Sequence, residues 1–67
     1  MEISLNNRKE IIEQEEIKLD ELITLKNYTF RLLVTKVNGK LIRKDARAET
    51  IIRDGDDVHV LHMISGG

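Results

Sequence analysis

The chain has 67 residues, room for a single small domain, and contains no cysteine, which excludes disulfides, thiolate metal sites and cysteine nucleophiles. Its charges nearly cancel to a net −1, so we expect no long-range attraction to nucleic acid or to an anionic membrane. The N-terminus has no signal-peptide pattern and no apolar segment approaches the ~20 residues that span a bilayer, so we expect a cytoplasmic protein.

Two short strands joined by a tight turn are predicted at the N-terminal end. Residues 1–5 alternate, with Ile3 and Leu5 on one face, as in a half-buried strand. Asn6-Asn7 suits a hairpin turn because asparagine tolerates positive φ. Residues 9–13 then form a second strand, whose polarity favours the edge of a sheet.

A polar connection, residues 14–18, precedes the predicted helix. Leu19, Leu22 and Ile23 are spaced i, i+3, i+4, which places three apolar side chains on one face of a helix over about residues 19–26. A helix this short does not persist alone. Its apolar face must therefore pack against other structure, most simply a sheet.

A second hairpin is predicted in the middle of the chain. Asn38-Gly39 between apolar runs is the strongest short hairpin signal, because both residues accept the positive φ of a type I′ turn. The turn joins predicted strands at residues 32–37 and 40–42. The charged segment that follows, residues 43–50, fits a single helical turn or a loop.

The last predicted strand, residues 58–63, follows the turn signal Asp54-Gly55-Asp56. It is apolar at nearly every position, as in a central strand. One helix across a mixed sheet of four or five strands is an α+β arrangement, with the first and last strands as parallel neighbours in the middle. We expect one domain, residues 1–67, with a flexible tail over residues 64–67.

No arrangement of side chains favours catalysis by the chain itself. Only His59 and His62 are bases suited to neutral pH. Three residues apart in a strand, they point to opposite faces and cannot easily share a metal ion. Ser4 and Ser65 lie in no nucleophile pattern. We therefore predict that the protein is not an enzyme.

Two acidic segments resemble cation sites but are better explained as solvated structure. Residues 13–16 favour an exposed loop. Residues 54–57, Asp-Gly-Asp-Asp, lack the spacing and the distal glutamate of an EF-hand and favour a turn. We therefore expect no metal site.

The last strand carries a candidate partner-binding surface. If Val58 and Val60 pack against the helix, the opposite face carries His59, Leu61 and Met63. An exposed apolar patch beside a flexible tail suits a protein partner. Burial of both faces in the core is the alternative.

A small basic cluster precedes this strand and contains Arg43, Lys44 and Arg47. These side chains are either simply solvated or dock an acidic surface of a partner. RNA binding is not favoured, because Tyr28 and Phe30 are the only aromatic residues and base stacking needs more.

The final residues are Ile64, Ser65, Gly66 and Gly67. A Gly-Gly end is thin and flexible, so it can enter a narrow enzyme channel. A merely frayed terminus is the alternative. If the tail is functional, only its backbone and the carboxylate of Gly67 remain to do chemistry.

Four motifs in the second half carry a family resemblance: Val37-Asn38-Gly39, Leu41-Ile42, Asp54-Gly55-Asp56 and the closing Met63-Ile64-Ser65-Gly66-Gly67. The chain resembles the ThiS family, the sulfur carriers of thiamine biosynthesis, and departs from it at Arg43, where that family often has proline. The resemblance covers the whole chain. It implies the β-grasp fold, which is the architecture of ubiquitin.

The resemblance also implies a mechanism in which Gly67 is the modified residue and the tail threads the active sites of partner enzymes. A ThiF-like enzyme would use ATP to adenylate the Gly67 carboxylate, and a sulfur donor would convert it to a thiocarboxylate. A ThiG-like thiazole synthase would then receive the sulfur. The chain itself would bind no cofactor. A MoaD-like carrier for molybdopterin synthesis, a ubiquitin-like modifier and a pure interaction module are the alternatives.

Overall fold

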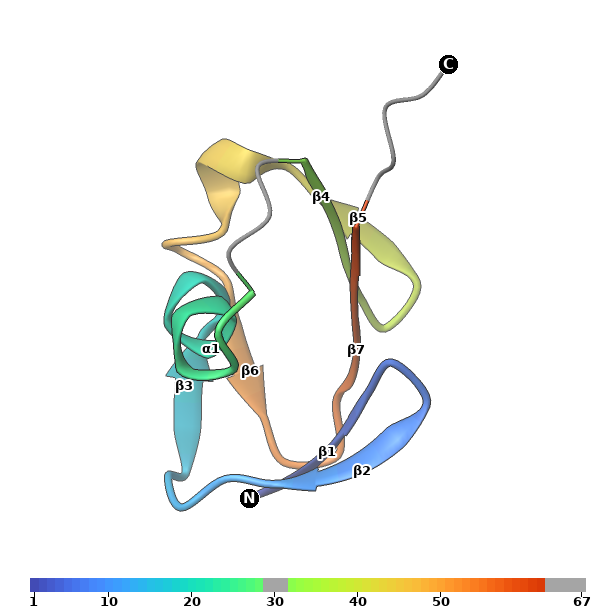
Figure 1. The fold of residues 1–67 in the computed structure, drawn as a ribbon. Coiled ribbons are helices and arrows are strands. Elements are labelled where there is room, and N and C mark those ends of the chain that lie inside the picture. Colours follow the sequence, from blue (N-terminus) through green and yellow to red (C-terminus); the bar gives the residue numbers. More distant parts are fainter. Residues whose placement is uncertain (29–31, 63–67) are drawn as a thin grey trace.

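The computed structural model describes residues 1–28 and 32–62, and a helix lies across one face of a sheet (Figure 1). The elements in chain order are β1 (Glu2–Leu5), β2 (Arg8–Ile11), β3 (Glu16–Lys18), α1 (Leu19–Leu25), β4 (Leu33–Val37), β5 (Lys40–Ile42), the short 3-10 helix η1 (Lys44–Ala46), β6 (Ile51–Arg53) and β7 (Asp57–His62).

The main sheet has five strands in the order β2-β1-β7-β4-β5. β1 and β7 pair in parallel, with Ser4 opposite Asp57, and the other pairs of this sheet are antiparallel. The mixed sheet, the edge position of β2 and the parallel pairing of first and last strands are therefore confirmed. β7 occupies the centre, between the two hairpins.

Both hairpin turns have the positive φ angles that their asparagines predict. Asn6 and Asn7 have φ of 52° and 66°, and Asn38 and Gly39 have φ of 52° and 82°. Positive φ at both central residues is the type I′ condition, which matches the twist of the flanking strands. The second turn sets the register, because it places Lys40 opposite Val37.

Helix α1 buries Leu19 and Leu22 completely, as the spacing predicts. Its first backbone N–H, at Leu19, donates to the carbonyl oxygen of Thr50 at 2.8 Å. It ends at Leu25, and two residues later the positive φ of Asn27, 58°, allows the N–H of Tyr28 to reach back to the Ile23 carbonyl. No helix in the described part of the chain is long and apolar enough to cross a membrane.

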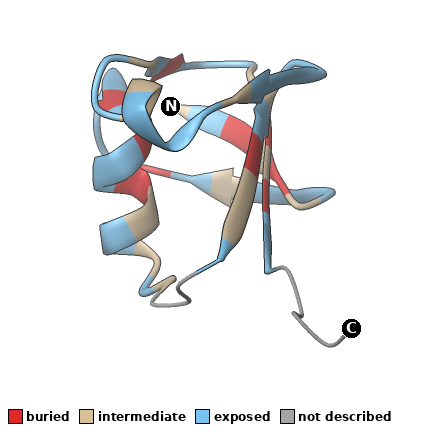
Figure 2. Cartoon of the chain, turned by 90° about the horizontal axis from the view of Figure 1, so that it is seen from above, coloured by how far each residue is buried: buried red, intermediate tan, exposed pale blue. Residues whose placement is uncertain are grey.

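The core lies between α1 and the inner face of the sheet, where the buried segments of strand and helix face one another (Figure 2). Among the described residues, nine apolar side chains are buried in it: Ile3, Leu5, Ile12, Ile17, Leu19, Leu22, Ile52, Val58 and Val60.

One predicted connection is wrong. Within residues 14–18, Glu16–Lys18 form strand β3, which pairs antiparallel with β6 in a second, two-stranded sheet. Ile17 and Ile52 are paired and buried there, while the neighbours of Ile17 are exposed. A strand with a single apolar residue shows no alternation, so the sequence pattern carries no signal for it.

Candidate functional site

The central strand β7 separates two faces. Val58 and Val60 point into the core and are buried, whereas Leu61 points outward and is 46% exposed. His59 shares the outward face, and its Nε2 lies 3.3 Å from Asp57 Oδ1. The alternation predicted for this strand is therefore present, and burial of both faces is excluded for Leu61.

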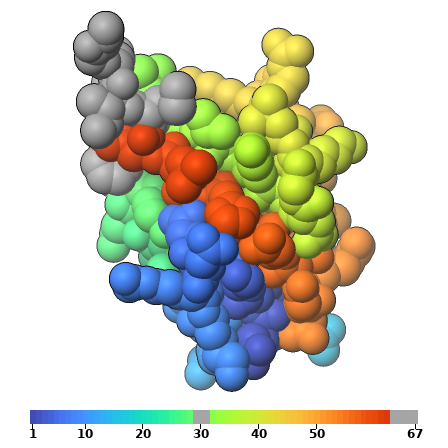
Figure 3. Space-filling model, turned by 90° about the vertical axis from the view of Figure 1, so that its right-hand side faces the viewer, coloured from blue at the N-terminus to red at the C-terminus, as the bar shows by residue number. Residues whose placement is uncertain are grey.

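Neighbouring strands extend this outward surface. Leu61 pairs with Val34, His59 pairs with Lys36, and Lys36 pairs in turn with Leu41 of β5. Paired residues share a face of a sheet. The five side chains, here called the outer face, therefore combine three apolar groups with a lysine and a histidine. Figure 3 shows β7 crossing this side of the molecule between the two hairpins.

The predicted surface omitted Val34, Lys36 and Leu41. The sequence does contain a signal for Lys36 and Leu41, because the two-residue Asn-Gly turn sets these residues opposite one another. The pairing of β4 with β7 is long-range, and no sequence pattern gives its register. Val34 opposite Leu61 could therefore only come from the structure.

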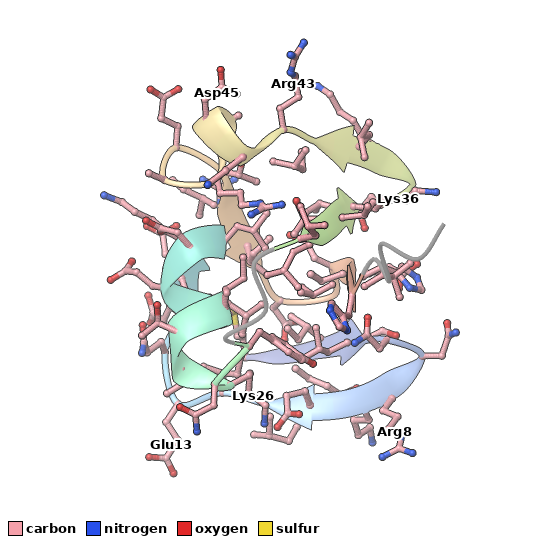
Figure 4. All side chains as sticks on the ribbon, turned by 45° about the horizontal axis from the view of Figure 1, so that its top comes forward. Arg8, Glu13, Lys26, Lys36, Arg43 and Asp45 are labelled. Atoms are coloured by element: carbon pink, nitrogen blue, oxygen red, sulfur yellow. The ribbon has the colours of Figure 1, made fainter. Side chains whose placement is uncertain are left out.

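The predicted basic cluster is divided by the structure. Arg43 and Lys44 are exposed and line an open hollow with Asp45. Figure 4 shows Arg43 and Asp45 near one another after the end of β5. Lys36 of β4 and Lys40 of β5 are further exposed cations of the same hairpin. Among the described residues, none of these four cations has an acidic group within 4.0 Å.

Arg47 does not belong to the exposed cluster, so that part of the prediction is wrong. Its Nη2 donates to the Leu33 carbonyl oxygen at 2.7 Å, and its Nε donates to Thr35 Oγ1 at 3.1 Å. Thr35 is fully buried and donates in turn to the Ile42 carbonyl at 2.7 Å. A buried hydroxyl needs such partners, and Arg47 provides one from the η1–β6 connection.

The acidic turn before β7 is used by the fold. Asp54 accepts from the Glu2 N–H at 2.7 Å, and Asp56 accepts from the Arg53 N–H at 2.8 Å. Gly55 has φ of 87°, which favours glycine. These carboxylates hold the turn that begins β7. Within the described ranges, no three His, Cys, Asp or Glu side chains are grouped to hold a metal ion.

The two histidines are separated as predicted. His59 pairs with Lys36 on the outer face, and His62 pairs with Leu33, whose register places it on the opposite face. The remaining predicted site residues lie outside the described residues: Met63, Ile64, Ser65, Gly66 and Gly67. The described chain ends at His62, immediately before this tail.

The model of the ThiS family matches residues 1–67. The chain belongs to the ThiS family. Members of this family are sulfur carriers that are not themselves catalysts. The resemblance seen in the hairpin, turn and tail motifs is thereby confirmed over the whole length.

Solved ThiS structures agree with this assignment. The chain superposes on the crystal structure of the thiamine biosynthesis protein ThiS from Geobacter metallireducens with a TM-score of 0.88, at 26% identity and with 100% of each chain covered. The solution structure of a thiamine biosynthesis protein from the same organism gives 0.78 at 26% identity, covering all of this chain and 88% of that one. The predicted β-grasp fold is confirmed.

Proposed function

We propose that this ThiS-family chain carries sulfur on its terminal glycine for the thiazole-forming step of thiamine biosynthesis. The observation that carries the proposal is the family match, which extends through Gly66-Gly67. The fold supports it, because β7 presents an apolar and basic outer face directly before the tail. The chain thus supplies a surface to be recognised and a terminus to be modified.

The chemistry would take place at the Gly67 carboxylate. A carboxylate is a poor electrophile, so a ThiF-like enzyme first transfers AMP from ATP to it and releases pyrophosphate. A sulfur donor then supplies hydrosulfide, which attacks the acyl carbon. The C–S bond forms, the bond from the acyl carbon to AMP breaks, and AMP and a proton are released. The resulting thiocarboxylate passes its sulfur to a ThiG-like thiazole synthase. Glycine at both final positions removes side chains that would block a narrow channel.

We infer that the outer face docks the adenylating enzyme. Leu61, Val34 and Leu41 offer apolar area, while Lys36 and Arg43 offer positive charge that no acidic group of the described residues approaches within 4.0 Å. The complementary surface on the enzyme would be apolar with an acidic rim. Arg43 and Lys44 lie at the margin of this face, at the end of β5.

Intact mass spectrometry after co-expression with a ThiF-like enzyme and a sulfur donor tests the proposal. The expected result is a mass gain equal to the replacement of one oxygen by sulfur, located on the C-terminal peptide. Deletion of Gly67 is the matched control. It should leave folding unchanged, because Gly67 lies five residues beyond β7, the last strand, and it should abolish loading.

A complementation assay assigns the pathway. Growth without thiamine should be restored to a bacterial strain that lacks its own carrier. A truncated chain without Gly67 that still restored growth would contradict the carrier mechanism. Loading without restored growth would instead favour a role in molybdopterin synthesis or protein modification.

A further inference from the structure

Strand β2 is an edge of the main sheet, with β1 on one side and no described strand on the other. The Ile12 N–H donates toward β1, to the Met1 carbonyl oxygen at 2.9 Å. Residues of an antiparallel pair alternate between bonding toward the partner strand and pointing away from it. The N–H and C=O groups of Lys9 and Ile11 therefore point to the free side, where a further strand could bind them.

The side chains along this edge combine an apolar centre with opposite charges at the two ends. Ile11 is 62% exposed. Arg8 begins the strand, and Glu13 lies in the bend that follows it. Both are exposed, and among the described residues neither has an opposite charge within 4.0 Å. Figure 4 shows their side chains at opposite ends of this segment.

An edge with this pattern is complementary to itself. If two copies pair antiparallel around a two-fold axis, the basic start of each strand meets the acidic end of the other. With Ile11 of both copies at the axis, their free backbone groups bond to one another and their side chains are in contact. Arg8 and Lys9 of each copy then lie beside Glu13 of the other. Apolar pairs and opposite-charge pairs across strands both stabilise a sheet.

The other edge of the main sheet lacks this complementarity. Lys40 lies within β5 and Arg43 directly follows it, and both are exposed. Antiparallel pairing of two β5 strands would bring like charges together, which is destabilising. Charged side chains on an edge normally prevent strand pairing. At β2 the two-fold arrangement instead makes the charges of one copy the partners of the charges of the other.

We propose that β2 is a self-association surface through which two copies of this chain form a two-fold dimer. The two five-stranded sheets become one continuous sheet. The strands β4 and β5 lie at the far end of each sheet, so Lys36 and Leu41 of the outer face stay uncovered. Because the contact joins two short strands, it belongs to the small and weak class of interfaces. The proposal goes beyond the sulfur-carrier function and does not depend on it.

Sedimentation equilibrium of the full chain, up to about 1 mM because the interface is weak, measures the dimer Kd. Arg8→Glu and Glu13→Lys should each raise this Kd about tenfold or more, since two-fold symmetry introduces each like-charge contact twice. The double variant R8E/E13K should return the Kd to within about threefold of wild type, because opposite charges face one another again. Lys40→Glu changes the net charge as R8E does, but on β5, and should leave the Kd unchanged.

Hydrogen exchange locates the interface on the strand. The Lys9 and Ile11 amides gain acceptors in the dimer, so their exchange should slow several-fold between dilute and concentrated protein. The Glu10 amide already faces β1 and should change little. Ile11→Pro removes an N–H on the free side only, which an edge strand tolerates. It should abolish the dimer while thermal unfolding remains cooperative.

Three outcomes overturn the proposal. The first is a wild-type chain that remains monomeric up to about 1 mM, a range that includes weak interfaces. The second is a dimer whose Kd is the same in R8E and E13K as in wild type. The third is a dimer that K40E weakens as much as R8E does, since net charge would then explain both effects. None of these results bears on the loading of Gly67, which is measured separately by mass.

Discussion

Leu61 and Leu25 have similar exposure but different surroundings. Leu61 is 46% exposed and pairs with Val34 on the outer face, beside the residues that precede the tail. Leu25 is 52% exposed in the last turn of α1, on the other side of the core. An exposed leucine is common on protein surfaces, so what marks Leu61 is its apolar neighbours rather than its exposure.

Replacing Leu61 with glutamate should weaken binding of the adenylating enzyme more than it destabilises the fold. A charge in an apolar contact costs roughly 1–3 kcal/mol of binding, about a tenfold to hundredfold increase in Kd. Leu25→Glu is the matched control and should leave Kd unchanged. Titration calorimetry and thermal unfolding measure the two effects. A large drop in the melting temperature of L61E, with Kd unaffected, would place Leu61 in the core instead.

At the scale of elements, the stability of helix α1 depends on contacts at both of its ends. Its N-terminus is held by the Thr50 carbonyl from the η1–β6 connection, and its C-terminus closes through Asn27 at positive φ. A seven-residue helix has little stability of its own, so these contacts and the buried Leu19 and Leu22 keep it folded.

Asn27→Ala should lower the free energy of unfolding by about 1 kcal/mol, because alanine is strained in the left-handed region. Asn27→Gly should leave stability unchanged or raise it, since glycine adopts this conformation freely. Urea unfolding measures both variants. Equal stability of the alanine variant and the wild type would show that the helix end has relaxed to another backbone conformation.

The sequence predicts those elements whose signals are local. The hairpins follow from Asn6-Asn7 and Asn38-Gly39, and the helix from the spacing of its leucines. β3 was missed because Ile17 is its only apolar residue. Two contacts were missed because each joins segments that are distant in sequence. One is the hydrogen bond from Arg47 to Thr35 Oγ1, and the other is the pair of hydrogen bonds between the Asn6 side chain and the Val60 backbone.

Across the whole molecule, a net charge of −1 is compatible with an uneven distribution of charge, although exposed Lys18 and Asp45 interrupt the two regions. Exposed acidic residues lie along the β2–β3 connection, the start of β3 and α1: Glu13, Glu15, Glu16, Asp20 and Glu21. Exposed basic residues gather on β4, β5 and η1: Lys36, Lys40, Arg43 and Lys44. Figure 4 shows Glu13 and Arg43 at opposite ends of the view. Such a distribution orients the chain as it approaches a charged partner.

Charge reversal at Lys36 should therefore raise the KM for adenylation several-fold at low salt, with the difference shrinking as ionic strength rises. Lys18→Glu makes the same change in charge on β3, away from the outer face, and should have little effect. Kinetics over a salt series measure both. An equal increase in KM for the two variants would indicate that only net charge matters.

The central place of β7 also governs when the protein can fold. Its pairings with β1 and β4 are what unite the two hairpins in one sheet, and they bring Leu5 beside Val58. During synthesis both hairpins leave the ribosome before this strand, because β7 follows them in the chain. A chain that stops before residue 57 has two hairpins but no strand to join them. An enzyme that docks on the outer face would therefore meet that face only on chains whose synthesis has passed β7. Folding of the sheet in this way prevents the enzyme from acting on shorter chains.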